Sequence, residues 1–85
     1  MAFRMKVDDI FHIGEKTILT GDLNTQAVAL AEVSCVIEVD GKPAVRLRIE
    51  GEVHTGKPHR DLWTISPISL TREVLRDHDV WLISE

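Results

Sequence analysis

Apolar and polar side chains alternate along most of this chain with the two-residue period that is typical of β-strands. The alternation is clearest over residues 44–53. One face of that run would carry Val45, Leu47, Ile49 and Val53, and the other Arg46, Arg48, Glu50 and Glu52. Six runs rich in Val, Ile, Leu, Thr, Phe and Trp are separated by polar or Gly/Pro breaks, and they span residues 3–11, 17–23, 33–39, 44–53, 61–66 and 79–84.

The first run is apolar on one face, whereas the last run is apolar on both faces, so the two patterns predict different positions in the fold. In the first run, Phe3, Met5, Val7 and Phe11 alternate onto one face and are expected in the core. The last run is apolar on both faces, which favours a central strand or one at an interface, with Trp81 at least partly buried. Helical signals are weak, and a single turn over residues 71–76 is expected after Thr71.

Six short strands in 85 residues predict an all-β fold, a small six-stranded antiparallel β-barrel, closed or nearly closed, with residues 1–85 as one domain. A chain of this length buries roughly 60–65% of the surface that it exposes when unfolded. It therefore has room for a single modest core.

The break Asp40-Gly41-Lys42-Pro43 poses a problem of phase. A regular two-residue turn would place the apolar residues of the two flanking runs on opposite faces. A longer loop or a bulge near residues 40–44 restores the phase, with Val45 across from Val39 and Leu47 across from Ile37. We therefore predict an irregularity at this turn.

Two segments carry a family resemblance. Residues 7–23 read as an apolar-acidic-Asp-apolar-Phe run, a turn with Gly14, and an apolar run that ends in Thr20-Gly21. Residues 69–82 contain an apolar residue, a basic-acidic pair, a further apolar residue and a closing apolar strand. Both segments resemble the β-barrel that forms the second domain of translation GTPases of the elongation factor Tu type.

That resemblance implies a barrel that, in the family, lies beside a nucleotide-binding domain and contacts transfer RNA or the ribosome. No Gly-rich phosphate loop followed by Lys-Ser/Thr is present, so GTP binding is not carried over. His78 stands where the family usually has glycine before its last strand. The resemblance therefore places His78 in a turn with positive φ and an exposed ring, and implies that His78→Gly is neutral or mildly stabilising. Asp9 is expected to have a structural role in its turn.

Charge, cysteine content and the length of apolar runs indicate the kind of partner, the state of the thiol and the cellular location. The formal net charge of −4, from 14 acidic and 10 basic residues, disfavours nucleic acid as the partner. The single cysteine, Cys35, lies inside a predicted strand and is expected to be a buried thiol. We find no signal-peptide pattern and no apolar run near the roughly 18 residues that span a bilayer, so we expect cytoplasmic residence and no membrane contact.

Residues 52–61 are the first choice for a functional loop, although a solvated connection between strands explains them too. The candidate partner-binding residues are His54, Lys57, His59 and Arg60 in this loop, with Arg46 and Arg48 on the polar face of the fourth run. Ion pairing across strands is the competing interpretation of the two strand arginines. A metal site is disfavoured because no third ligand accompanies the two loop histidines, and no cofactor is expected.

The sequence favours a non-catalytic binding module whose partner is a protein, in a setting that is translation-related if the resemblance holds. No nucleophile lies in an elbow or triad setting, and no specific pair of carboxylates is present, so we do not expect an enzyme. Trp63 and Trp81 are expected to be core or interface anchors. A small inhibitor or immunity-type protein that blocks one enzyme or toxin is the alternative, and a homo-oligomer stays open.

Overall fold

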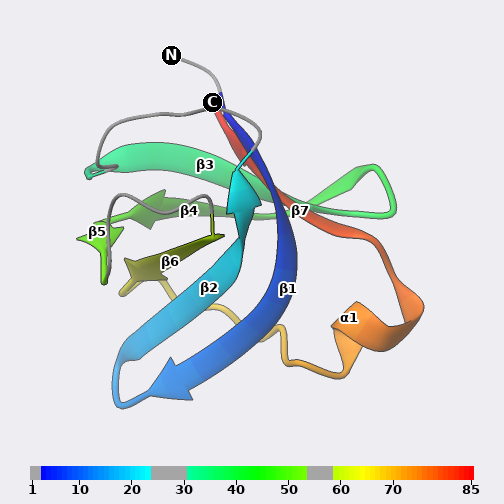
Figure 1. Ribbon diagram of the computed structural model, residues 1–85, viewed down its shortest axis with the longest axis horizontal. Coiled ribbons are helices and arrows are strands. Elements are labelled where there is room, and N and C mark those ends of the chain that lie inside the picture. The colour runs from blue at the N-terminus through cyan, green and yellow to red at the C-terminus, as the bar shows by residue number, and fades with distance from the viewer. Residues whose placement is uncertain (1–2, 24–30, 54–58) are drawn as a thin grey trace.

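The computed structural model describes residues 3–23, 31–53 and 59–85 (Figure 1). The elements are β1 (Arg4–Ile13), β2 (Lys16–Leu23), β3 (Val33–Val39), β4 (Lys42–Ile49), β5 (Gly51–Glu52), β6 (His59–Thr64), α1 (Val74–Asp77) and β7 (Val80–Ser84). The strands form one antiparallel sheet in the order β4-β3-β7-β1-β2-β6-β5. The prediction of an all-β fold is confirmed.

The last strand of the chain lies inside this sheet. β7 pairs with β1 through Arg4 opposite Ile83 and with β3 through Ile37 opposite Leu82. Figure 1 shows β1 and β7 side by side where β1 begins and β7 ends. The prediction that the closing run is central is confirmed.

The sheet has seven strands because the run predicted over 44–53 is divided at Glu50 into β4 and β5. The sheet is not closed, yet its two end strands follow each other in the chain. Between them, the backbone N–H of Glu50 donates to the carbonyl of Trp63 at 2.9 Å. The alternation of buried and exposed side chains along this run also ends at Glu50. The alternation predicts Val53 on the same face as Leu47 and Ile49, and this is wrong, because those two residues are buried and Val53 is 50% exposed.

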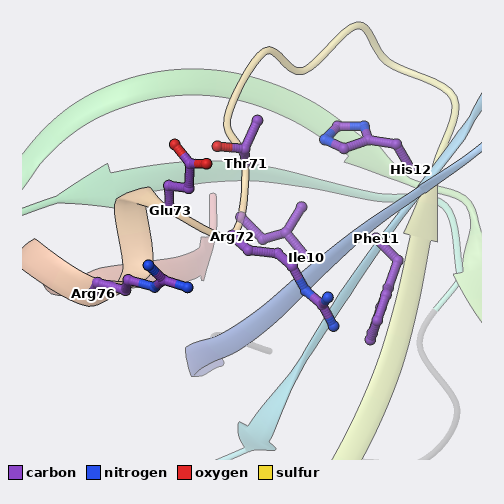
Figure 2. A pocket seen from close by; sticks show the side chains of 7 residues that line it. All are labelled: Ile10, Phe11, His12, Thr71, Arg72, Glu73 and Arg76. Carbon is purple, nitrogen blue, oxygen red and sulfur yellow. The ribbon is translucent and has the colours of Figure 1, made fainter.

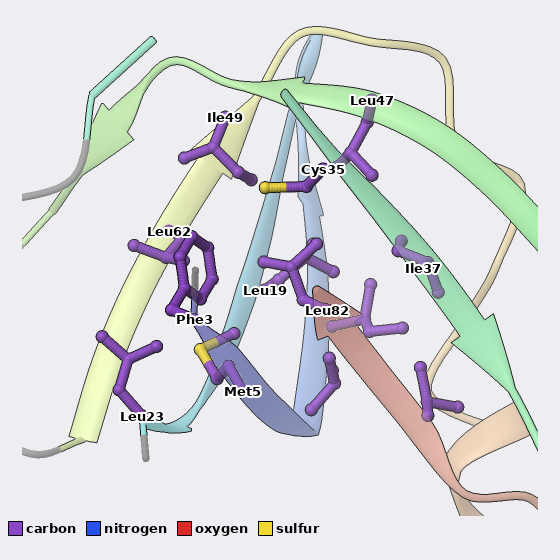
Figure 3. Packing of buried hydrophobic residues seen from close by; sticks show 13 residues of the cluster. Phe3, Met5, Leu19, Leu23, Cys35, Ile37, Leu47, Ile49, Leu62 and Leu82 are labelled. Atoms are coloured by element: carbon purple, nitrogen blue, oxygen red, sulfur yellow. The ribbon is translucent and has the colours of Figure 1, made fainter. Parts of the chain in front are cut away.

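The core fills the concave side of the sheet (Figure 3). It consists of Phe3, Met5, Val7, Ile10, Leu19, Leu23, Cys35, Ile37, Leu47, Ile49, Leu62, Val80 and Leu82. The buried thiol predicted at Cys35 is confirmed, since the residue is fully buried and burial, with a smaller effect from Glu85, raises the pKa of the thiol to about 11.

A bulge in β1 turns Phe11 away from this core. Val7 is opposite Gly21 but Asp9 is opposite Thr20, so Asp8 is the extra residue and the alternation changes phase there. Ile10 is consequently buried, whereas Phe11 is exposed, and the prediction that Phe11 joins the core is wrong. The close approach at the bulge requires glycine at position 21, since a Cβ there would collide with the backbone carbonyl of Lys6.

The predicted irregularity after β3 is present. Asp40 and Gly41 both have positive φ, at 52° and 82°, and form a two-residue turn between Val39 and Lys42. The register then shifts, so that the apolar faces of β3 and β4 coincide. The bulge is confirmed. The individual pairs differ from the prediction by two residues, because Val45 lies across from Ile37 and Leu47 across from Cys35.

The segment before β7 differs in detail from its prediction. The helical turn is α1, over 74–77 rather than 71–76, with Glu73 at its N-cap. His78 follows α1 and is exposed, as expected, but its φ of −138° is extended rather than positive. Its Nδ1 lies 2.6 Å from Oδ2 of Asp40. This contact lowers the pKa of Asp40 and raises that of His78, so the expectation that His78→Gly is neutral no longer follows.

Trp81 is partly buried, as predicted, but it lies on the side of β7 opposite the core. Val80 and Leu82 take the core side, and the guanidinium of Arg4 covers the indole ring at 4.7 Å from its centre. Trp81 therefore packs on the outer side of the sheet, where it contacts Arg4 of the neighbouring strand β1.

Candidate functional site

Apolar side chains cross the outer side of the sheet in one row. Phe11 of β1 is opposite Ile18 of β2, Ile18 is opposite Trp63 of β6, and Trp63 is opposite Gly51 of β5. The row lies close to the turn between β1 and β2, which extends to the lower left of Figure 1. We call the side chains of Phe11, Ile13, Ile18, Val53 and Trp63 the apolar face.

Several of these side chains are open to solvent. Ile13 is 61% exposed, Val53 50% and Phe11 37%. Together with Ile18, Thr20 and Asp61, these three line a shallow groove of about 300 Å³, which we call the hairpin groove. Contiguous exposed apolar surface with a polar rim is typical of a site where another molecule binds.

Trp63 extends the apolar face past the hairpin groove. Its indole lies against Gly51, where a Cβ would come within 3.0 Å of the ring nitrogen. The ammonium of Lys16 lies 4.6 Å from the centre of the ring. Glycine in β5 therefore makes room for the tryptophan, and a cation–π contact holds the lysine over it.

A second groove, of about 410 Å³, runs between β1 and the segment that leads into α1. Figure 2 shows its lining residues, which are Ile10, Phe11, His12, Thr71, Arg72, Glu73 and Arg76. We call it the helix groove. Phe11 lines both grooves, so the apolar face and the helix groove are adjacent.

Arg72 joins the two segments that carried the family resemblance. Its Nε and Nη2 donate to the two carboxylate oxygens of Asp9 at 2.7 and 2.9 Å, and its guanidinium lies 4.7 Å from the centre of the Phe11 ring. The bidentate contact lowers the pKa of Asp9 and raises that of Arg72. Asp9 also accepts from the N–H of Ile10 at 2.9 Å, which agrees with a structural role.

The side chain of His12 contacts both the segment before α1 and the neighbouring strand β2. One ring nitrogen lies 2.8 Å from the carbonyl oxygen of Leu70 and the other 3.2 Å from the hydroxyl of Thr17. The contact with Leu70 holds the segment before α1 against β1, and the contact with Thr17 joins β1 to β2. This arrangement supports the position of Arg72.

The strand arginines proposed as candidate residues take part in ion pairs. Arg46 lies 3.7 Å from Glu85, and Arg48 lies 3.3 Å from Glu32 and 3.6 Å from Glu50. All of these guanidinium groups are at least half exposed. The geometry agrees with the competing interpretation, in which these charges pair with neighbouring carboxylates.

The loop candidates are separated from one another. His54 and Lys57 lie outside the described residues. His59 is exposed, and its Nδ1 lies 3.1 Å from Oδ1 of Asp22 and 3.8 Å from Oδ2 of Asp8. Arg60 is only 5% exposed, so it cannot contribute an open surface charge.

Arg60 forms a buried ion pair instead. Its Nη1 donates to Oε1 of Glu52 at 2.7 Å, and the side chains are 6% and 1% exposed. Alternation along β6 places Arg60 on the same side as Leu62 and Thr64, which are also buried. Its position on the inner side is the physical reason that Arg60 is no surface candidate.

Within the described ranges, no group of three or more histidine, cysteine or acidic side chains has an arrangement that could hold a metal ion. The same part of the chain contains no helix long and apolar enough to cross a membrane.

The hairpin groove was not predicted from sequence. Trp63 was expected as an anchor, but the alternation placed Phe11 in the core and Val53 on the face of Leu47 and Ile49. Ile13 and Ile18 were not singled out. Only the register around the bulge shows that Phe11 and Ile13 belong outside. Comparisons with protein-family models, with curated protein sequences and with solved structures gave no match.

Proposed function

We propose that this domain is a non-catalytic binding module that binds a protein partner with its apolar face. The observation that carries the proposal is the exposure of Phe11, Ile13 and Val53 beside Ile18 and Trp63 on neighbouring strands. Removing these side chains from water on association contributes roughly 25 cal/mol for each Å² of apolar surface, from which the entropic and desolvation costs of association are subtracted. Aromatic anchors are enriched at such interfaces.

Electrostatics supports a protein rather than a nucleic acid. The net charge is −4, and the guanidinium groups of Arg46, Arg48 and Arg72 each lie beside a carboxylate. Binding to a phosphate backbone depends on many basic side chains that neutralise phosphates. Pairing with carboxylates reduces the positive charge that these arginines could offer to phosphates.

We further propose that the sheet acts as a small antiparallel barrel of the translation-factor second-domain type, and that the module works in a translation-related, cytoplasmic setting. Three observations support the barrel. The end strands β4 and β5 are consecutive, the N–H of Glu50 donates to the carbonyl of Trp63, and the hydroxyl of Thr64 donates to the carbonyl of Arg48 at 2.6 Å. The translation-related setting is supported by the resemblance of residues 7–23 and 69–82 alone.

Affinity capture from cell extract, with and without RNase, tests the proposed function. The bait proteins are the wild-type domain, an Ile13→Asp variant and a Lys42→Asp control. Ile13 is in the apolar face, whereas Lys42 is an exposed residue at the turn between β3 and β4, on the other side of the molecule in Figure 1. Both substitutions place an aspartate on the surface, so the two variants differ mainly in location.

We expect one set of proteins to be captured by the wild type and by Lys42→Asp, to survive RNase and to be lost with Ile13→Asp. Capture that is equal for all three baits, or that RNase abolishes, would contradict the proposal. The identity of the captured set then separates a translation-related module, which would retain ribosome-associated proteins, from an inhibitor, which would retain one enzyme in a fixed ratio.

A further inference from the structure

We infer that the hairpin groove recognises a lysine or arginine side chain of the partner, with Asp61 as the group that binds its charge. This inference rests on the proposed function and adds the chemistry of the partner segment. Asp61 is the charged residue among the side chains that line the groove.

Asp61 lies in β6 on the outer side of the sheet, opposite Thr20 of β2, and is partly buried. Its backbone carbonyl accepts from the N–H of Val53 at 2.8 Å, which holds Val53 next to it. The hydroxyl of Thr20 donates to Asp8 at 2.9 Å and is therefore committed elsewhere. Across residues 3–23, 31–53 and 59–85, no ion pair satisfies the carboxylate of Asp61.

A carboxylate in apolar surroundings gains most from a cation, because it is partly removed from water. Lysine and arginine also have aliphatic stems that pack on apolar surface while the charged end reaches a polar group. Ile13, Ile18, Val53 and the ring of Phe11 supply that surface. The groove thus offers one complementary contact for each part of a basic side chain.

The described basic side chains near the groove each face another group. His59, two residues before Asp61 on the same side of β6, lies 3.1 Å from Asp22. Arg72, over the ring of Phe11, is compensated by the two oxygens of Asp9. Lys16 is over Trp63 and outside the lining of the groove. The net charge of −4 adds a general attraction for a basic partner.

Short peptides provide the probe. Four N-acetylated, C-amidated tripeptides have leucine at both ends and lysine, arginine, norleucine or glutamate in the centre. Each is titrated into ¹⁵N-labelled wild-type domain while backbone amide shifts are recorded. We expect the lysine and arginine peptides to shift the amides of Ile18, Val53 and Asp61, and to bind at least about tenfold more tightly than the norleucine peptide. The glutamate peptide should bind most weakly.

Two variants test whether Asp61 causes the preference for the lysine peptide over the norleucine peptide. Asp61→Asn should make the lysine and norleucine peptides bind equally, whereas Asp77→Asn, which alters an exposed carboxylate in α1, should leave the preference intact. Equal binding of the lysine and norleucine peptides to the wild type, persistence of the preference in Asp61→Asn, or absence of binding by every peptide would each overturn the inference. The proposed function fails separately, when Ile13→Asp still captures the same proteins as the wild type.

Discussion

Removal of Arg60 alone should destabilise the fold more than removal of the whole ion pair. The side chains of Arg60 and Glu52 are 6% and 1% exposed and meet at 2.7 Å, so Arg60→Met leaves a buried carboxylate without its cation. Breaking a buried pair from one side costs about 3–5 kcal/mol. For a domain of this size, that loss lowers the melting temperature by roughly 12–40 °C.

The double variant makes the reasoning testable even if Arg60→Met barely folds. Glu52→Leu combined with Arg60→Met removes both charges and leaves apolar groups, an exchange that is often close to neutral. Because domains of this kind are stable by roughly 5–15 kcal/mol, we expect the double variant to fold and to be more stable than Arg60→Met. Arg46→Met is the control, since Arg46 is 83% exposed and its loss should cost less than about 1 kcal/mol.

Urea unfolding followed by far-ultraviolet circular dichroism measures all four proteins. A free energy of unfolding for Arg60→Met within about 1 kcal/mol of the wild type would refute the reasoning, because such a small loss is typical of exposed pairs. A double variant that is no more stable than Arg60→Met would also refute it.

Gly21→Ala should cost more than about 3 kcal/mol in urea unfolding, because the new Cβ collides with the backbone. Cys35, whose pKa is raised to about 11, should react with Ellman's reagent at pH 8 in urea but not in the folded state. Trp81→Ala should cost about 1–3 kcal/mol, less than a fully buried aromatic residue, and an unchanged melting temperature would contradict this. The pKa of His78 is raised above 6.5 and that of Asp40 is lowered, so their contact stabilises the fold below about pH 6.5 as long as Asp40 is ionised. This contribution is lost as the pH rises through the folded pKa of His78, and Asp40→Asn should return the NMR titration of His78 to its ordinary range.

The strands were predictable because each is a local pattern. All six runs contain a strand, and their ends differ from the structure by a few residues. The bulge after β3 was also predictable, since the phases of Ile37 and Leu47 conflict in a regular hairpin. The order of the sheet was not, because the place of β7 between β1 and β3 depends on pairing between distant parts of the chain.

The candidate site could be predicted only in part, for two different reasons. Phe11 and Ile13 continue the odd-numbered apolar pattern of Met5 and Val7, so that pattern assigns them to the core. Asp9 interrupts the pattern at the bulge, but a single polar residue does not show that the phase changes there. The burial of Arg60, in contrast, had a signal. It is two residues before Leu62, on the inner side of the same strand, and the period of two places both in the core.

Site-specific photocrosslinking in cells tests the central claim most directly, namely that the apolar face binds a protein. The photoreactive residue benzoylphenylalanine replaces Ile13 in one protein and Lys42 in another, so that both probes are exposed but lie on different parts of the sheet. We predict a discrete, RNase-resistant crosslinked protein from position 13 and none of the same size from position 42. The same crosslink from both positions, or a crosslink from position 42 alone, would contradict the claim.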